Sequence, residues 1–536
     1  MGKRRKRDNI IVQGSILVAA SIFVRIIGLV YRIPLVNILG NEGMGVYSQA
    51  FEVYQILLLI SSYSLPLAVS KLVSARVVVG EHKNVHRIFQ GALIFAAGVG
   101  LVVGTFTFFA SNWLSKLCFG YEDTAPALKV LAPTIMIVAV MGVFRGFFQG
   151  KNSMLPTAVS QIIEQIFNAI VSVLAAFILV KNGAAYGAAG GTLGTCLGAL
   201  SGLIFLVFVY YLYRPTIHKL MDKDKTKEVM PYSHISKLIV MIVAPVILSS
   251  AIYQLSNILD SIIFSKSTVA LGYDTKLVQS LYGIYSGKYK TLINIPLAVA
   301  TALAAALIPS VTAARTLHRN DVVGDKINLT LRFNMLISMP CMVGLMVLSS
   351  PILQMLFHDT STTSARLLML GSLNIAVFST STVSNAILQG INRMKLPVIH
   401  AAISLGIYVV FAIVLVRFCD LNVFGLVYAN LVFGFCMCLL NAFAIKREVN
   451  MQQSFLKTYI LPLAASVVMG AVAFFVYKGL YFLIHSNTLA TLSAIIVGVI
   501  VYGIAILLMG GISEEELYTL PKGRTIAALF RKMHLL

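Results

Sequence analysis

The chain has 536 residues, of which 58% are hydrophobic and only 12% are charged, and its mean hydropathy is +0.87. This composition excludes an ordinary soluble domain and indicates a membrane protein. The net charge of +22 would suit a nucleic-acid-binding protein. The basic residues lie where they set membrane topology, however, so we expect no nucleic-acid partner.

Apolar segments of about 20 residues recur along the chain, each long enough to cross a hydrocarbon layer of about 30 Å. We therefore predict an all-α polytopic membrane protein with fourteen transmembrane helices. Their expected ranges are 10–31, 46–73, 86–111, 125–149, 155–180, 186–213, 236–263, 281–311, 332–357, 363–389, 397–416, 422–445, 457–483 and 488–510. The connections are too short for an independent soluble core. This argues against a polytopic enzyme with a large catalytic loop, and we expect no enzymatic activity.

Most of the 42 Lys and Arg residues fall on one side of this predicted topology. They include the run from Lys3 to Arg7, the linker residues Lys219, Lys223, Lys225 and Lys227, and Arg315, Arg319, Arg531 and Lys532. The positive-inside rule places this side, with both termini, in the cytoplasm.

The six cysteines are scattered and lie mostly within predicted spans. Cys436 and Cys438 are two residues apart and so point to different sides of a helix. The sequence therefore predicts neither a disulfide framework nor a metal site. The glycine-rich stretch from Gly187 to Gly194 lies in an apolar span, where it favours close helix packing over a phosphate-binding loop.

Two phrases recur in the same order and indicate an internal repeat. Gln-Gly-x-Asn-x-Met begins at Gln149 and again at Gln389, each time with a Leu-Pro shortly after it. Pro-Leu-Ala-Val begins at Pro66 and again at Pro296. Both echoes are displaced by six predicted spans, an even number, so the copies run in the same direction through the membrane.

This repeat predicts two parallel six-helix lobes followed by an additional helix pair. We expect an N-lobe over 1–214, a cytoplasmic linker over 215–235, a C-lobe over 236–446, and two further helices with a cytoplasmic tail over 447–536. Paired repeats in membrane proteins typically close around a central site that opens to alternate sides. This organisation is typical of a transporter.

Charged residues within or near the spans are mostly basic. The cations are Arg25, Arg32, Lys71, Lys129, Arg145, Lys288, Lys290 and Lys478, and the acids are Glu52, Glu164 and Asp260. Each cation facing lipid at mid-membrane would cost about 2.5–3.5 kcal/mol. A water-filled cavity between the lobes removes most of this cost, and an electropositive cavity implies an anionic cargo.

The first span carries the sharpest candidates. Ser21, Arg25, Gly28 and Arg32 form one polar stripe at helical spacing. Gly28 leaves room for a bulky group between the two arginines, whose guanidinium groups can bind phosphate with two parallel hydrogen bonds. Arg32 could alternatively extend to the membrane interface, and Lys288 and Lys290 could be interface anchors rather than cavity residues.

The acids admit two interpretations. Glu164 shares a face of the fifth span with Gln161 and Asn168, and Glu52 lies on a polar stripe of the second span. Such stripes can bind cargo or can form hydrogen bonds between helices. Asp260, near the outer end of the seventh span, is a candidate site for a coupling cation or proton.

Several of these residues fall in a recognisable pattern. The run Arg145-Gly-Phe-Phe-Gln-Gly150, followed by Met154, Pro156 to Gln161 and Glu164-Gln165, resembles the signature of Gram-positive polysaccharide-biosynthesis and sporulation-type flippases. These belong to the multidrug/oligosaccharidyl-lipid/polysaccharide exporter superfamily, which includes the lipid II flippases of the MurJ kind. Arg25 with Gly28 is similar to an Arg-x-x-Gly motif of that family.

The resemblance implies a flippase in the bacterial plasma membrane, surrounded by membrane lipids. Its cargo would be an undecaprenyl-diphosphate-linked glycan, above all lipid II. Arg25 and Arg32 would hold the diphosphate, Arg145, Lys288, Lys290, Glu164 and Glu52 would line the cavity, and spans thirteen and fourteen would line a groove for the lipid tail. No cofactor is implied, and we expect a monomer.

One departure from the family pattern bears on the driving force. The family's sodium sites use carboxylates on spans seven and eleven, but span eleven, from Leu396 to Val416, contains none. Membrane potential is an alternative source of energy, because moving one charge through 100 mV is worth about 2.3 kcal/mol. Teichoic, capsular or spore-specific precursors remain alternative cargoes, and a cation-coupled multidrug exporter of the same superfamily remains an alternative function.

Overall fold

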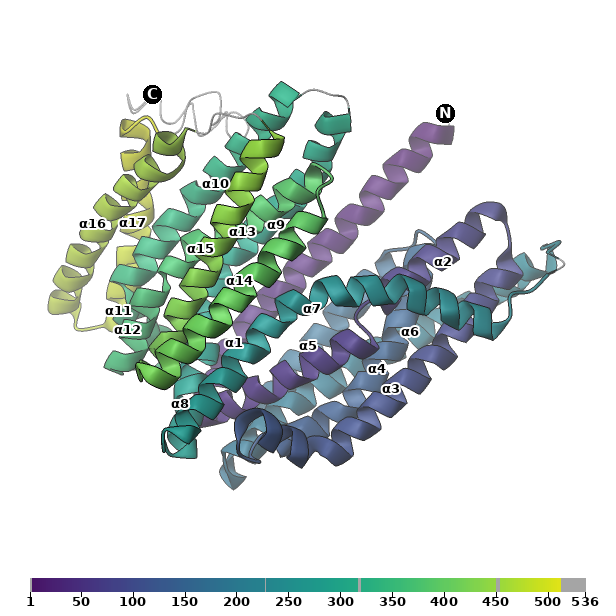
Figure 1. Cartoon of the computed structure of the whole chain (residues 1–536), viewed down its shortest axis with the longest axis horizontal. Coiled ribbons are helices and arrows are strands. Elements are labelled where there is room, and N and C mark those ends of the chain that lie inside the picture. Colours follow the sequence, from purple (N-terminus) through teal and green to yellow (C-terminus); the bar gives the residue numbers. More distant parts are fainter. Residues whose placement is uncertain (1, 227, 317–319, 450–453, 512–536) are drawn as a thin grey trace. The chain divides into compact units, whose positions relative to one another are not determined.

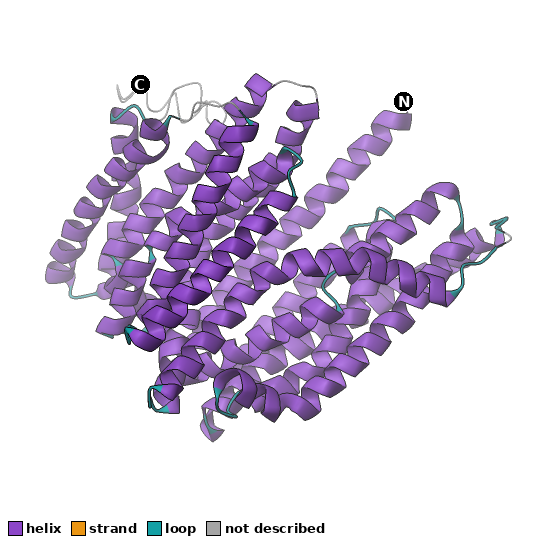
Figure 2. Ribbon diagram, viewed as in Figure 1, coloured by secondary structure: helices purple, strands orange, loops and turns teal. Residues whose placement is uncertain are grey.

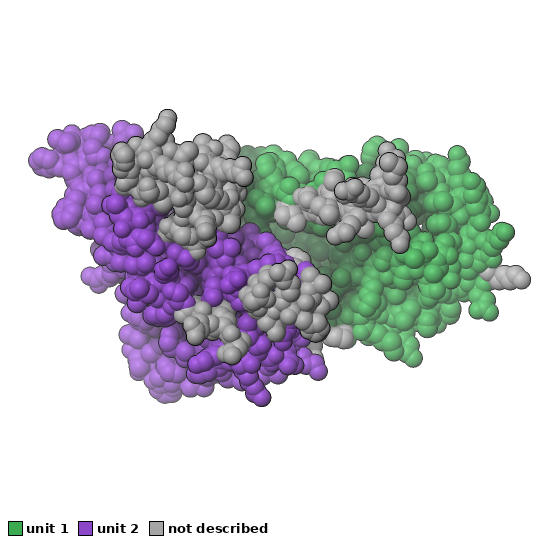
Figure 3. All heavy atoms as spheres, turned by 90° about the horizontal axis from the view of Figure 1, so that it is seen from above, with its two compact units in different colours: residues 1–287 green, residues 288–536 purple. Residues whose placement is uncertain are grey.

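The computed structural model describes residues 2–226, 228–316, 320–449 and 454–511 (Figure 1). Every regular element within these ranges is helical (Figure 2). Contacts between Cα atoms divide the chain into two compact units, residues 1–287 and 288–536 (Figure 3). These units are defined by compactness, whereas the predicted N-lobe and C-lobe are defined by the sequence repeat. The boundaries of the two lobes therefore stay a prediction.

The first unit contains eight α-helices among the described residues. They are α1 (Gly2–Ser61), α2 (Leu65–Val79), α3 (His82–Phe119), α4 (Ala125–Gly150), α5 (Leu155–Leu179), α6 (Ala184–Asp222), α7 (Tyr232–Ala270) and α8 (Thr275–Gly283). A short 3-10 turn, η1 (Val180–Asn182), follows α5, and a π-helical turn, η2 (Ile284–Tyr289), follows α8.

The helices of the second unit continue in chain order. They are α9 (Lys290–Thr316), α10 (Asn320–Val347), α11 (Ser349–Phe357), α12 (Thr362–Gly371), α13 (Leu373–Gly390), α14 (Lys395–Ile413), α15 (Asn422–Glu448), α16 (Leu461–Ile484) and α17 (Asn487–Leu508). π-helical turns, η3 (Val414–Phe418) and η4 (Leu456–Ile460), follow α14 and precede α16.

The all-helical membrane fold is confirmed, but the count of fourteen spans is not. Twelve stretches of the described residues are long and apolar enough to cross a membrane. The first two predicted spans are counted within one stretch, Ala19–Val79, although α1 consists of two helical segments that meet at Gly40, whose non-helical φ of 66° favours glycine. The predicted seventh span lies in α7, of which only Tyr232–Ala244 qualifies, as a shorter apolar helix.

The repeated Gln-Gly-x-Asn phrase forms the same helix-ending turn in both units. Asn152 after α4 and Asn392 after α13 have φ values of 58° and 65°, in the left-handed region that asparagine tolerates. In each copy the asparagine N–H donates to the carbonyl of Gln149 or Gln389, and the next N–H donates to the carbonyl five residues earlier. This is the Schellman arrangement. The repeat in the sequence is therefore a repeat in local structure.

The glycine of this phrase sits against a neighbouring helix in both copies. A Cβ on Gly150 would lie 2.8 Å from the carbonyl oxygen of Ser70 on α2, and one on Gly390 would lie 3.1 Å from Cβ of Val311 on α9. Helices α2 and α9 also carry the two Pro-Leu-Ala-Val copies. Each unit thus uses the same two phrases at one helix–helix contact.

The glycine-rich stretch of α6 packs closely against α5, as the sequence predicts. A Cβ on Gly190 would lie 2.5 Å from the carbonyl oxygen of Ala175, and one on Gly198 would lie 2.6 Å from that of Glu164. A Cβ on Gly194 would overlap the hydroxyl and the backbone nitrogen of Ser172. Small residues that let helix backbones approach are typical of helix pairs in membranes. This contact fixes the position of α5, which carries part of the candidate site.

Candidate functional site

Arg25 and Arg32 lie on α1 and differ in their burial and in the hydrogen bonds that their guanidinium groups form. Arg25 is exposed and forms no hydrogen bond or ion pair with any described residue. Arg32 is half-buried, and its single hydrogen bond among these residues is a long one, 3.5 Å from a terminal nitrogen to the carbonyl oxygen of Ser286. Its Nε is buried and has no partner in the described part of the chain. Neither guanidinium is paired with a carboxylate there, so both keep capacity for an anion.

Gly28 lies between these arginines, but the space beside it is taken. A Cβ on Gly28 would lie 3.3 Å from Nε2 of Gln165 on α5. In this structure the absent side chain admits an amide from the neighbouring helix, and the approach of a bulky group beside Gly28 stays a prediction. Gln165 forms no hydrogen bond with another described residue, so its donor and acceptor atoms stay available beside the arginine stripe.

Arg145 and Glu164 form an ion pair that sequence reasoning did not predict. The two side chains are 13% and 27% exposed, and a terminal nitrogen of Arg145 lies 2.6 Å from Oε2 of Glu164. Nε of Arg145 also donates to the Ser160 hydroxyl at 3.1 Å. Both groups come from the stretch most typical of the resemblance. The pair holds α4 against α5 and neutralises one of the predicted cavity cations.

Glu52 and Asp260 each accept a hydrogen bond from a tyrosine on or next to α8. The Tyr282 hydroxyl donates to the Glu52 carboxylate, with oxygen–oxygen distances of 2.7 and 2.9 Å. The Tyr285 hydroxyl donates to Oδ2 of Asp260 at 2.7 Å, and Asp260 is 1% exposed. These bonds connect α1 and α7 through α8. The sequence analysis missed these tyrosines, and the signal that could have found them is the pair of small residues beside them, Gly283 and Gly287, which lie in close contact with α1.

The glycines beside these tyrosines bring α8 onto α1. A Cβ on Gly283 would overlap the carbonyl oxygen of Asn41, and one on Gly45 would overlap that of Gln279. The Gln279 amide donates to Asp123 in the turn between α3 and α4. Buried polar groups in the first unit are thus tied into hydrogen bonds between helices, which is the second of the two interpretations given for Glu52.

Lys288 and Asp359 form a buried ion pair in the second unit. The ammonium lies 2.5 Å from Oδ2 of Asp359, and each side chain is only 8% exposed. Burial would raise the pKa of the Asp359 carboxyl, but hydrogen bonds from Lys288, from the Ser364 hydroxyl and from the Ser361 N–H outweigh it and lower the pKa. Lys290 is half-buried. Lys288 is therefore paired with a carboxylate, and a role of Lys288 in cargo binding stays a prediction.

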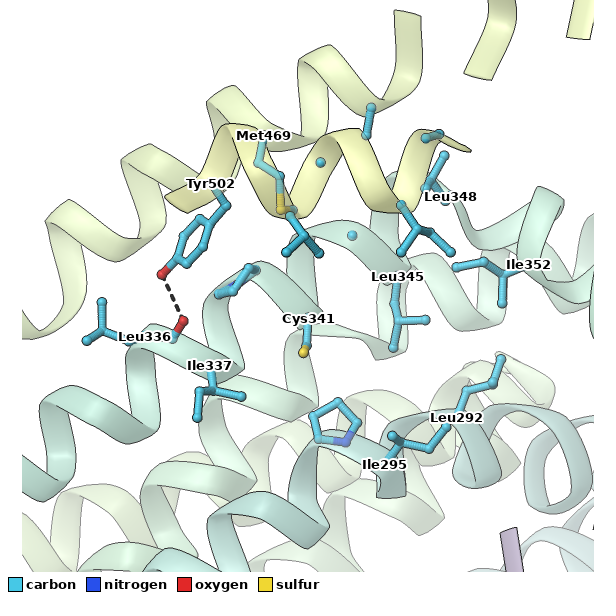
Figure 4. Close-up of a pocket in the computed structure, with 18 residues that line it drawn as sticks. Leu292, Ile295, Leu336, Ile337, Cys341, Leu345, Leu348, Ile352, Met469 and Tyr502 are labelled. Carbon is cyan, nitrogen blue, oxygen red and sulfur yellow. Dashed lines mark hydrogen bonds between the residues drawn. The ribbon is translucent and has the colours of Figure 1, made fainter. Parts of the chain in front are cut away.

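An apolar groove of about 450 Å³ lies within the second unit (Figure 4). Helix α10 contributes Cys341 and Leu345, and α16 and α17 contribute Met469 and Tyr502. The Tyr502 hydroxyl points toward Leu336 of α10 and donates to its carbonyl oxygen at 2.8 Å (Figure 4). The resemblance implied a groove on the last two helices, and the structure has one there.

The fold matches that of solved membrane transporters. Lipid II flippase MurJ in an inward closed conformation aligns over 91% of this chain and 97% of its own, with a TM-score of 0.66 and 16% identity. An inward-facing multidrug resistance MATE family transporter of the MOP superfamily aligns over 79% of this chain and 95% of its own, with a TM-score of 0.62 and 16% identity. The chain therefore shares the fold of these two solved transporters.

Sequence comparison gives the family. Residues 11–315 match the profile described as polysaccharide biosynthesis protein, so the chain belongs to that family. The lipid II flippase MurJ of Bacillus subtilis (strain 168) is 26% identical over 462 residues, which cover 83% of this chain and 84% of that protein. Stage V sporulation protein B of the same organism is 25% identical over 345 residues, which cover 64% of this chain and 66% of that protein.

Proposed function

We propose that this protein is a flippase that carries an undecaprenyl-diphosphate-linked glycan, lipid II first among these, from the inner to the outer leaflet of the bacterial plasma membrane. The protein acts as a monomer with both termini in the cytoplasm. Its membership of the polysaccharide biosynthesis family and its likeness to a lipid II flippase support this.

The observation that carries the proposal is the exposed guanidinium of Arg25, which has no partner among the residues that the structure describes. A cation within a membrane-spanning helix costs about 2.5–3.5 kcal/mol unless water or an anion compensates it. Arg145 and Lys288 are compensated by carboxylates, whereas Arg25 and Arg32 have none among the described residues. A diphosphate supplies the missing negative charge and matches the planar donor pattern of arginine.

The apolar groove of the second unit supports a lipid-linked cargo. Its lining is almost wholly apolar, and its volume of about 450 Å³ lies within the range of ligand pockets. We assign it to part of the polyprenyl tail, which would otherwise contact bilayer lipid. Charged headgroup contacts on α1 and a dry groove on α10, α16 and α17 are the two kinds of surface that such a molecule needs.

Membrane potential is the proposed driving force. A diphosphate with about two negative charges that leaves a negative interior gains about 4–5 kcal/mol per 100 mV. The protein then needs only to lower the barrier by alternating access. Purified protein in vesicles should transport faster with the potential negative on the cargo side, and transport that ignores potentials of both signs would exclude this mechanism.

Rescue of a bacterium whose only lipid II flippase can be switched off tests the cargo and the arginine together. Wild type should rescue, and Arg25→Ala should lower transport by about 10–100-fold, because charged hydrogen bonds contribute about 1.5–3 kcal/mol. Arg76→Ala is the matched control, since Arg76 is a half-exposed arginine already paired with Glu81 at 3.0 Å. Rescue by Arg25→Ala would exclude Arg25 as the contact. Failure of a well-expressed wild type would exclude lipid II.

Another undecaprenyl-linked glycan is the second candidate cargo. The match to stage V sporulation protein B favours a precursor used in spore formation. The same vesicle assay with that lipid in place of lipid II separates the two, because the diphosphate is shared and only the sugar differs.

A further inference from the structure

A second groove lies in the first unit, between α3 and α4, and has a volume of about 390 Å³. Its lining includes Gly100, Leu101, Gly104, Phe108, Lys129 and Met136. Lys129 is the one charged residue of that lining. The side chain is exposed and forms no hydrogen bond or ion pair with any other residue that the structure describes.

The groove exists because two glycines of α3 remove side chains where the helices touch. A Cβ on Gly104 would lie 2.8 Å from the carbonyl oxygen of Ala132, and one on Gly100 would lie 2.8 Å from Cα of Met136. Leu101 and Phe108 stand exposed beside this gap. The backbones of α3 and α4 approach closely at the two glycines, and larger side chains project beside them. This leaves a trough along the helix pair, which opens on the surface where large apolar residues of α3 face the membrane.

These contacts fix the level of Lys129 along the trough. Gly100 lies opposite Met136 and Gly104 opposite Ala132, so the helices run antiparallel and Lys129 comes one turn further, near Phe108. At 1.5 Å per residue, the trough extends about 12 Å from the level of Phe108 to that of Gly100. Its lining in that direction is apolar apart from the Thr105 hydroxyl.

The other direction leads to the membrane interface. Helix α3 continues past Phe108 to the exposed Trp113 and to Lys116 in its last turn. Tryptophan is enriched at the headgroup level, and Trp113 is about 7.5 Å beyond Phe108 along the helix. The four-carbon stem of Lys129 can bridge much of that depth and bring its ammonium to the headgroups. The predicted topology makes this the outer leaflet.

We propose that this trough binds one anionic phospholipid, with an acyl chain along Gly104 and Gly100 and the phosphate on Lys129. The trough is apolar, has the length of an acyl chain and has a cation at one end. It therefore complements a lipid whose apolar chain is attached to an anionic headgroup. Lys116 has no comparable role, because it pairs with Glu122 at 3.9 Å. The inference does not depend on the proposed flippase activity.

Native mass spectrometry of the full-length protein, titrated with phosphatidylglycerol or phosphatidylcholine, tests the proposal. Wild type should bind phosphatidylglycerol more tightly. Lys129→Gln should weaken phosphatidylglycerol binding by about fivefold, since one interfacial lysine contributes about 1 kcal/mol, and should weaken phosphatidylcholine binding less, because the choline ammonium already balances the phosphate charge of that lipid. Lys116→Gln is the matched control and should behave as wild type.

A second variant tests the trough itself. Thr105→Trp fills it from the exposed side and should reduce binding of both lipids, while the helical circular dichroism and melting temperature stay those of wild type. A folded Thr105→Trp that retains both lipids overturns the placement of the acyl chain. A preference for phosphatidylglycerol that survives Lys129→Gln, or that falls equally with Lys116→Gln, overturns the headgroup assignment.

Discussion

Removing the charge of Asp359 should strongly destabilise the second unit. In Asp359→Asn the Lys288 ammonium, 8% exposed, loses its counter-ion but stays buried. Breaking a buried ion pair by removing one partner costs about 3–5 kcal/mol, because the remaining charge is desolvated without compensation. At about 2–4 °C per kcal/mol for a unit of this size, the melting temperature should fall on the order of 10 °C.

The double variant Lys288→Met/Asp359→Leu separates charge from packing. Replacing both partners by apolar groups of similar volume is often neutral or stabilising. We therefore expect its melting temperature, followed by circular dichroism in detergent, to return to within a few degrees of wild type. The single variants Lys288→Met and Asp359→Leu, together with this double variant, form a thermodynamic cycle whose coupling energy isolates the ion pair.

Two results would refute this reasoning. If Asp359→Asn melts like wild type, the ammonium is not desolvated and the buried pair is wrong. If the double variant is as unstable as the singles, packing rather than charge holds this site. The double variant also tests Lys288 as a cargo contact: a stable double variant that does not rescue flippase-depleted cells supports that prediction, and full rescue excludes it.

Three further predictions follow from packing, backbone and charge. Gly194→Ala should lower the free energy of unfolding by about 1–3 kcal/mol through overpacking at the α5–α6 contact. Gly98→Ala is the control and should not lower it, because a Cβ on Gly98 meets nothing within 4 Å, and thermal melting compares the two variants. Asn152→Val should cost about 1–2 kcal/mol, because a β-branched residue resists the left-handed conformation, and equal melting of Asn152→Val and wild type would contradict this. Slight burial raises the pKa of the Asp224 carboxyl, but hydrogen bonds, led by one from the Lys83 N–H, lower this pKa to about 2. The contribution of Asp224 to folding stability should therefore be complete above about pH 4 and disappear as the pH falls toward 2. Asp224→Asn should abolish this pH dependence in acid titrations of stability.

The fold was largely predictable because its main signals are local. Apolar runs define spans without knowledge of their neighbours, and the repeated phrase beginning at Gln149 and Gln389 encodes a turn that depends on a few consecutive residues. The boundary between the first two spans was not predictable in the same way. The helical run is broken by non-helical backbone only at Gly40, which lies between the predicted spans 10–31 and 46–73, and Asn41 and Glu42 are already helical.

The site was less predictable, because its pairings depend on which helix faces meet. Arg145 and Glu164 were both identified as charged residues in spans, yet nothing local indicates that they bond to each other across α4 and α5. The partner of Lys288 is Asp359, which lies outside the predicted spans and was therefore not among the charges considered. Tyr282 was overlooked because a tyrosine in an apolar stretch reads as packing, whereas its hydroxyl is a donor to Glu52.

The pairings change the electrostatic argument for an anionic cargo. From sequence, eight cations against three acids suggested a broadly basic cavity. In the structure Arg145 is neutralised by Glu164 and Lys288 by Asp359, so these two cations no longer contribute to such a field. Arg25 and Arg32 stay on one helix face without carboxylate partners among the described residues. Recognition by two guanidinium groups depends on geometry, so substituting lysine at either position should retain the charge yet lose the paired hydrogen bonds that distinguish a diphosphate from other anions.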